Sequence, residues 1–247
     1  MKGCSKSNIH REFKVMGVFA VVRRRGPVLS DSHKSQRVEY CRWALRNVCK
    51  VKVLCFSDET WITSNPAKGR FWQWLRKGEF PDSIGTDSHP MKVCFWIAIG
   101  KGFKCLVVLD CSDGRNMTKQ RYETMLSEQN KLWKILRKEK IPFQEDRHPI
   151  HKAEEWLRQH HVPLPDKQWP EKGPDLSPVE TVNQWLKLAI SKRGPWGVEE
   201  ITKVAKEEFE KIEQSRIDRL VDTFHDRCKQ CIEAKGGLVK AKRRDRS

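Results

Sequence analysis

The chain has 247 residues, of which 38% are hydrophobic, and a formal net charge of +17 at pH 7. This length and composition support one large domain, or one domain with appendages, around a real core, so the chain is expected to fold. No apolar stretch reaches membrane-spanning length and the N-terminus has no signal-type apolar core, which argues against an integral-membrane or a secreted protein.

The positive charge gathers at the two ends of the chain. In the first 52 residues Lys and Arg are opposed only by Glu12, Asp31 and Glu39, and a second basic cluster closes the sequence. Such asymmetry favours a polyanion as partner, most often nucleic acid, over a merely solvated basic surface. The predicted DNA contacts are Lys6, Arg11, Lys14, Arg23, Arg24, Arg25, Lys242, Arg243 and Arg244.

Three segments precede the first predicted strand. Residues 4–18, "CSKSNIHREFKVMGV", have serine caps and Ile9 and Phe13 one turn apart, which predicts a short basic helix. Residues 21–35 form an extended basic connector, and residues 35–48 have the pattern of an amphipathic helix.

Strands are predicted next. Residues 51–59, "VKVLCFSDE", are apolar on both faces except for Lys52, as in a central strand, and end in two acids. Asp58 and Glu59 must point to opposite faces, because side chains alternate along a strand. After an irregular excursion over residues 64–90, residues 91–100 and 103–110 predict an antiparallel hairpin.

The second half alternates helices with one short strand. A helix is predicted over residues 118–140, a strand over residues 141–146 that ends at Asp146, and a helix over residues 151–161. A proline-rich loop leads to a helical region from Pro178 to about Cys231, which residues 193–197 interrupt. This order predicts an α/β fold, with a mixed sheet flanked by helices.

The stretch "GPDLSPVE" has two interpretations. Ser177 fits a helix N-cap, proline fits the first helical position, and Glu180 fits the third position of a capping box. Alternatively, Glu180 is a metal ligand held on the first turn of a helix. If the strands ending at Asp58 and Asp146 are parallel neighbours, their carboxyl ends lie side by side, and Glu180 can complete a cluster there.

A cluster of three carboxylates predicts divalent cations. Such a cluster would repel itself without them, and hard oxygen ligands select Mg²⁺ or Mn²⁺. Two such ions roughly 4 Å apart activate an attacking oxygen and stabilise a leaving oxygen in phosphodiester cleavage. Taken one at a time, these acids fit a strand end or a helix cap at least as well.

The nine cysteines are scattered through the chain, several of them within apolar runs, which predicts buried free thiols in a reducing compartment. "HDRCKQC" brings His225, Cys228 and Cys231 to helical spacing. A structural zinc site needs four ligands and no second pair is evident, so zinc is the weaker interpretation.

Three longer stretches carry a family resemblance. "VLCFSDE", "FQEDRHPIH" and "WPEKGPDLSPVE" closely resemble, in this order, the three catalytic motifs of the Tc/mariner superfamily of DDE transposases, in the branch whose third acid is glutamate. The resemblance covers nearly the whole chain from about residue 5, and the third motif is the most specific.

The resemblance implies a function and a site. Asp58, Asp146 and Glu180 would be the metal-binding triad, holding two Mg²⁺ or Mn²⁺ ions in an RNase H-like domain at residues 51–235. This domain would follow a basic helical arm and connecting helix at residues 1–50 and precede a basic tail at residues 236–247. The enzyme would cut double-stranded DNA at transposon ends and join the 3′-hydroxyl to target DNA in the nucleus.

His151 matches the histidine of the second motif and is a candidate accessory residue, with a surface histidine at a helix start as the alternative. Trp72 and Trp74 in the excursion are candidates for a homodimer contact or a DNA contact, with a place in the core as the alternative. No membrane partner is expected.

The chain also departs from the family pattern. Arg147 and His148 follow the second acid where Asn-Ala is usual, Asn183 stands where a tryptophan is usual, and 33 residues separate Asp146 from Glu180, one fewer than usual. Family members begin with two helix-turn-helix units, and the N-terminal segment of this chain resembles only the last helix of the second unit. These departures keep open the alternative of a domesticated or degenerate transposase that binds DNA without cutting it.

Overall fold

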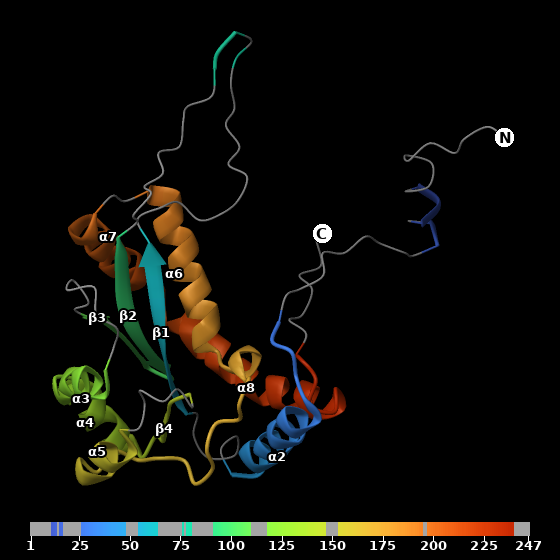
Figure 1. Ribbon diagram of the computed structural model, residues 1–247, viewed down its shortest axis with the longest axis vertical. Helices are drawn as coiled ribbons and strands as arrows, with labels where there is room; N and C mark the ends of the chain where they lie inside the picture. Colours follow the sequence, from blue (N-terminus) through green and yellow to red (C-terminus); the bar gives the residue numbers. More distant parts are fainter. Residues whose placement is uncertain are drawn as a thin grey trace.

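The computed structural model describes residues 11–13, 15–16, 26–47, 54–63, 76, 78–80, 91–109, 118–146, 153–194 and 197–239. A mixed sheet with helices around it forms the body of the protein (Figure 1). Its strands are β1 (Cys55–Thr63), β2 (Lys92–Gly100), β3 (Phe103–Leu109) and β4 (Phe143–Gln144). The strand order is β3-β2-β1-β4, with β4 parallel to β1 and the other pairs antiparallel.

The described helices divide between the two faces of this sheet. They are α2 (Asp31–Asn47), α3 (Lys119–Ser127), α4 (Asn130–Glu139), α5 (Glu154–Gln159), α6 (Val179–Arg193), α7 (Val198–Glu210) and α8 (Gln214–Glu233), with a 3₁₀ turn, η2, at Pro174–Leu176. Buried residues of α2, α6, α7 and α8 share one core with Phe56 of β1, and those of α3, α4 and α5 share a second core with Cys55. The predicted fold class, a mixed sheet flanked by helices, is confirmed.

Strand β1 separates its two acids as predicted. Phe56 belongs to the core under α6 and α8, and Asp58, two residues on, faces the same side. Glu59 faces the other side, where its charge acts on Tyr122 of α3. Only Asp58 is therefore available to a site built with α6.

The predicted ends of two elements were wrong. β1 continues to Thr63, past Asp58, because its antiparallel pairing with β2 extends to Thr63 opposite Lys92. α2 begins at Asp31 rather than at residue 35, because Ser30 and His33 form a reciprocal cap: the His33 N–H donates to Ser30 Oγ, and the Ser30 N–H donates to His33 Nδ1, both at 3.2 Å.

Two predicted helices are each broken once more than expected. The helix predicted over residues 118–140 is divided into α3 and α4, and side chains bond the last carbonyls of α3: Trp133 Nε1 donates to Leu126 O at 2.7 Å. The region after Pro178 breaks again between α7 and α8. There Lys104 Nζ donates to the carbonyl oxygens of Phe209 and Ile212, both at 2.9 Å, and so caps the end of α7.

Helix α2 lies against α8 at one end of the sheet, so a segment that precedes β1 is part of the folded body (Figure 1). The boundary at residues 50 and 51 stays a prediction. None of the helices in the described ranges is long and apolar enough to cross a membrane.

Candidate active site

The three predicted carboxylates line one pocket of about 460 Å³. Asp58 comes from the middle of β1, Asp146 from the segment just after β4, and Glu180 from the first turn of α6. The remaining wall is formed by the loop that runs from Trp169 to Pro174. The clustering that the sequence predicts is therefore observed.

Parallel pairing explains how β1 and β4 share the pocket. Cys55 pairs with Phe143 and Phe56 with Gln144, so the chain leaves β4 beside the stretch of β1 that carries Asp58. A parallel pair of only two residues on each strand is enough to bring Asp58 and Asp146 to one pocket, because the carboxyl ends of parallel neighbours face the same edge of the sheet.

The capping box predicted for Glu180 is not formed. The backbone follows the prediction, with Ser177 extended (φ −77°, ψ 122°) and Pro178 helical (φ −63°, ψ −31°), but no side chain caps the start of α6. The Glu180 carboxylate faces the pocket instead, where the charge of Asp146 acts on it. The structure thus contradicts the capping-box interpretation, and the metal-ligand interpretation of Glu180 stays a prediction.

The loop before α6 needs glycine at one position. A Cβ at Gly173 would lie 2.9 Å from Trp169 Nε1 and 3.1 Å from Pro170 O, closer than side-chain atoms normally approach. Gly173 thus lets the loop fold tightly against Trp169, whose ring packs in turn against Phe56 and Phe224. This packing fixes the wall of the pocket opposite Asp58.

The pocket is electrostatically strained. Burial, followed by repulsion from Glu180, Glu59 and Asp146, raises the pKa of Asp58 to about 7. Burial also raises the pKa of Glu180; Lys187 and a hydrogen bond with Asn183 act against this rise, and Asp146 adds to it. A positive charge in the pocket would relieve this repulsion.

Asn183, one turn after Glu180, lies between two of the acids. Its Nδ2 donates to Asp58 Oδ2 at 2.6 Å, and its side chain also hydrogen-bonds Glu180. The side chain is 3% exposed, and its Oδ1 atom is buried without a hydrogen-bond partner. The Asn183 amide therefore bridges Asp58 and Glu180 by hydrogen bonds, which is the role that a bound cation would have.

The donor chemistry of the pocket fits Mg²⁺ or Mn²⁺, since the three acids offer hard oxygen ligands whose charges repel one another. Within the described ranges, however, no three His, Cys, Asp or Glu side chains lie close enough together to hold a metal ion. To bind a cation, the three acids would have to draw together and Asp58 would have to exchange its bond from Asn183 for the ion.

The raised pKa of Asp58 predicts how the stability of the metal-free protein depends on pH. The folded value of about 7 lies above the ordinary value of 3.8, so the stability that the protonated form contributes is complete below about 4 and lost above about 7. Asp58→Asn should remove this dependence. In thermal melts with EDTA, we expect the variant to melt higher than the unmodified protein at pH 8 and equally at pH 4. An equal or lower melting temperature at pH 8 would contradict this assignment.

Most of the other predicted site residues lie outside the described ranges: Lys6, Lys14, Arg23, Arg24, Arg25, His151, Lys242, Arg243 and Arg244, together with Trp72, Trp74, Arg147 and His148. Arg11 is described and exposed, within a short helical stretch. Their roles stay predictions.

The three residues of the weaker zinc interpretation lie in α8. Cys228 and Cys231 are buried and turn towards Cys41 of α2, whereas the His225 side chain is 44% exposed and lies 3.8 Å from Asp226. The three residues named for zinc thus face different surroundings.

Two residues near the acids, Asn183 and Lys172, were not assigned a role from the sequence. Asn183 was noted only as a departure from a family pattern, although its spacing of three residues from Glu180 places both on one helix face. Lys172 adds a basic side chain to the pocket wall. No sequence signal distinguished it from the many other lysines of the chain.

Comparison with known proteins identifies relatives along almost the whole chain, although no protein-family model matches it. The Tc1 transposase of Caenorhabditis elegans is 23% identical over 254 residues, covering 96% of this chain and 88% of that protein. The Tcb2 transposase of Caenorhabditis briggsae is 24% identical over 250 residues, covering 94% and 86%. The chain is therefore homologous to the Tc1 and Tcb2 transposases. This confirms the predicted resemblance.

Solved structures of a Tc/mariner transposase share the fold. The Mos1 transposase paired-end complex with the left transposon end matches with a TM-score of 0.72 and 19% identity, over 96% of this chain and 72% of that one. The Mos1 paired-end complex with Mn matches with a TM-score of 0.71. The isolated Mos1 catalytic domain matches with a TM-score of 0.64 and 16% identity, over 88% of this chain and 100% of that one. The sheet and its helices thus share the fold of the Mos1 catalytic domain.

Proposed function

We propose that this Tc/mariner transposase homologue is a DNA-cutting and strand-transfer enzyme that uses Mg²⁺ or Mn²⁺ at Asp58, Asp146 and Glu180. The observation that carries the proposal is the convergence of these three acids on one pocket, where burial, together with repulsion from the neighbouring acids, raises the pKa of Asp58 to about 7. The Mos1 structures with Mn and Mg support the choice of metals.

Each acid would serve the reaction from a different element of the fold. Two divalent cations, when bound, would lower the barrier to phosphodiester cleavage by activating the attacking oxygen and stabilising the leaving one. Asp58 on β1, Asp146 just after β4 and Glu180 on α6 would hold the cations. Trp169 and Pro170 would limit water access from the loop side.

Lys172 in the pocket wall and Asn183 beside Asp58 would assist the three acids. Lys172 lines the pocket wall and can neutralise a substrate phosphate next to the carboxylates. Asn183 would release Asp58 when metal arrives and thereby act as a place-holder in the metal-free protein. Such a place-holder keeps Asp58 oriented towards Glu180 before a cation binds.

A supercoiled plasmid together with a labelled duplex bearing a free 3′-hydroxyl tests the proposal. Nicking of the plasmid and joining of the duplex should require Mg²⁺ or Mn²⁺ and stop with EDTA. The alternative function, DNA binding without cutting, is favoured by the Asn183 bond that ties Asp58 to Glu180. Binding of the duplex with no nicking in either metal would establish that alternative.

DNA binding itself should be strong at low salt and nearly blind to sequence. The net charge of +17 provides many potential phosphate contacts, and phosphate contacts carry no sequence information. For six or more such contacts, affinity should fall by about 1000-fold between roughly 50 and 200 mM salt. Competition between transposon-end and scrambled duplexes, repeated at roughly 50 and 200 mM salt, measures both the sequence preference and the salt dependence. A large preference for the ends would contradict the prediction.

The proposed activity on DNA also suggests a cellular location and an assembly state. An enzyme that acts on chromosomal DNA has to reach the nucleus, so we propose a nuclear protein, which imaging of the tagged chain in cells would test. The homodimer stays a prediction, and light scattering of the purified chain with and without DNA would check it.

A further inference from the structure

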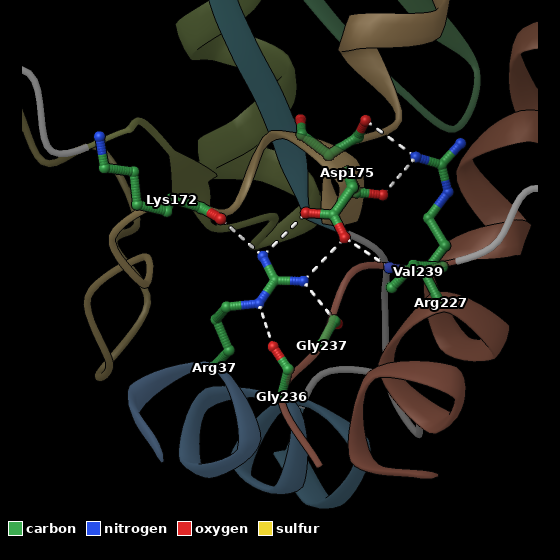
Figure 2. A network of polar contacts seen from close by, with 8 residues as sticks. Arg37, Lys172, Asp175, Arg227, Gly236, Gly237 and Val239 are labelled. Carbon is green, nitrogen blue, oxygen red and sulfur yellow. Dashed lines mark hydrogen bonds and ion pairs between the residues drawn. The ribbon is translucent and has the colours of Figure 1, made fainter. Parts of the chain in front are cut away.

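Helix α2 carries a buried arginine whose bonds all go to other segments. The Arg37 side chain is 0% exposed and uses its five N–H groups in five hydrogen bonds (Figure 2). Two of them form a fork on the Asp175 carboxylate, with Nη1 to Oδ1 at 2.8 Å and Nη2 to Oδ2 at 2.7 Å. The others reach the carbonyl oxygens of Lys172 at 2.7 Å, Gly236 at 2.9 Å and Gly237 at 3.1 Å.

This arginine joins three parts of the chain that are distant in sequence. Lys172 belongs to the loop that forms the pocket wall, Asp175 belongs to η2 directly after it, and Gly236 and Gly237 follow α8. Asp175 is further held by the Val239 N–H, which donates to its Oδ2 at 2.7 Å. A fork of two charge-assisted hydrogen bonds fixes orientation as well as distance, so the loop is held in one position.

A second arginine holds the same loop from α8. Arg227 Nη1 donates to the carbonyl oxygens of Asp175 at 3.1 Å and Ser177 at 3.0 Å, and its Nη2 donates to Thr181 Oγ1 at 3.2 Å. Figure 2 shows the two guanidinium groups on different sides of Asp175. Thr181 directly follows Glu180, so Arg227 bonds residues on both sides of the start of α6.

Helix α2 also reaches the segment that carries Asp146. Tyr40, one turn after Arg37, is 1% exposed and donates from its hydroxyl to Gln144 Oε1 at 3.0 Å. Gln144 Nε2 donates in turn to the carbonyl oxygen of Glu145 at 2.7 Å. The residue after Glu145 is Asp146, so one face of α2 holds the chain immediately before two of the three acids.

The close approach of the C-terminal segment to α2 depends on a glycine. Gly236 has φ +83°, and a Cβ there would lie 2.3 Å from the carbonyl oxygen of Lys34. Only a residue without a side chain fits between the end of α8 and α2 in this conformation. The contact between Gly236 and Arg37 is therefore built into the fold.

From these contacts we propose that α2 is a brace for the active site, in which Arg37 and Tyr40 are positioning residues that set Glu180 and Asp146 relative to each other. The proposal rests on the proposed function, because it concerns the carboxylates that would hold the metal ions. Arg37 acts through Asp175 and the loop before α6, and Tyr40 acts through Gln144 and β4. Neither touches the pocket itself.

If α2 is a brace, substitutions of Arg37 and Tyr40 should change metal-dependent nicking more than they change DNA affinity. Arg37→Lys keeps the charge but loses the fork, and Tyr40→Phe loses only the hydroxyl. Misplacement of a reacting group by about 1 Å can cost roughly 100-fold in rate. We expect about 100-fold slower plasmid nicking for Arg37→Lys and about 10-fold for Tyr40→Phe, with a matching rise in the Mn²⁺ concentration needed for half-maximal rate and unchanged affinity for a DNA duplex.

Two measurements do not need activity. Mn²⁺ binding followed by electron paramagnetic resonance should weaken in both variants. Amide hydrogen exchange of the metal-free proteins should speed up over residues 172–184 and 236–239 in Arg37→Lys and over residues 143–146 in Tyr40→Phe, with the rest of the sheet unchanged. The matched control is Arg46→Lys, an exposed position on the same helix, which should behave as the unmodified protein in every assay.

The outcomes separate the brace from the proposed function. Variants that nick DNA at the unmodified rate with the unmodified Mn²⁺ requirement would overturn the brace. If Arg37→Lys does not fold, Tyr40→Phe, which removes one oxygen atom, decides by the same criteria. An unmodified chain that neither binds Mn²⁺ nor nicks DNA would overturn the proposed function. Local exchange alone would then test the brace: faster exchange confined to the segments named above supports it, and unchanged exchange refutes it.

Discussion

Asp58→Asn should abolish metal-dependent nicking by the chain while leaving DNA binding intact. A divalent cation contributes several kcal/mol of transition-state stabilisation, and each 1.36 kcal/mol is a factor of ten, so we expect a loss of about 1000-fold or more. The expected loss is large because an amide is a poor substitute for a charged ligand at a hard cation. Nicking rates of supercoiled plasmid in Mg²⁺ and in Mn²⁺ measure it.

The adjacent acid supplies a matched control for Asp58→Asn. Glu59 lies next to Asp58 on β1 but faces the opposite side of the sheet, towards Tyr122. Glu59→Gln removes the same charge from the same strand and should retain most of the nicking activity. DNA affinity should persist in both variants and rise slightly in Asp58→Asn, because the pocket loses negative charge. Nicking that survives Asp58→Asn would refute the assignment of Asp58.

The topology of the sheet was predictable from short patterns. "VLCFSDE" and "FQED" each couple an apolar run to an acid, and if two such strands are parallel neighbours they bring their acids to one edge. The observed pairing of Cys55 with Phe143 confirms this, even though β4 has only two residues. The position of Asp58 within its strand was not predictable, because the antiparallel partner that extends β1 to Thr63 begins only at Lys92.

The fine structure of the site depended on contacts that no local pattern contains. The pattern of serine, proline and glutamate correctly predicted where α6 begins, but not that Glu180 would turn into the pocket and away from a cap. That choice depends on burial beside Asp146 and on Asn183, whose hydrogen bond with Glu180 replaces a capping bond. Likewise, Arg37 looked like one more basic residue of an amphipathic helix, although tertiary packing buries it completely.

Comparison of Glu180→Gln with Glu180→Ala should show that this residue acts through its charge. No side chain caps the start of α6, so alanine should cost clearly less than the roughly 1 kcal/mol typical of a lost cap. Both variants should lose nicking by about 1000-fold, because neither side chain offers an anionic oxygen to a divalent cation. Thermal melts and plasmid nicking, measured on the same preparations, provide the two readouts.

The control for Glu180 comes from the same pocket. Glu171 lines it from the loop, with a side chain that is 47% exposed and within 3.3 Å of His33. Glu171→Gln removes one charge from the pocket without touching α6 and should nick DNA at close to the unmodified rate. In EDTA at pH 8, Glu180→Gln should melt at or above the temperature of the unmodified protein. The substitution removes the repulsion by which Glu180 helps to raise the pKa of Asp58, and the glutamine side chain keeps an oxygen that can accept the hydrogen bond from Asn183. A Glu180→Gln protein that cuts DNA as fast as Glu171→Gln would show that the third carboxylate is not a ligand, and the site would then have to be rebuilt around Asp58 and Asp146 alone.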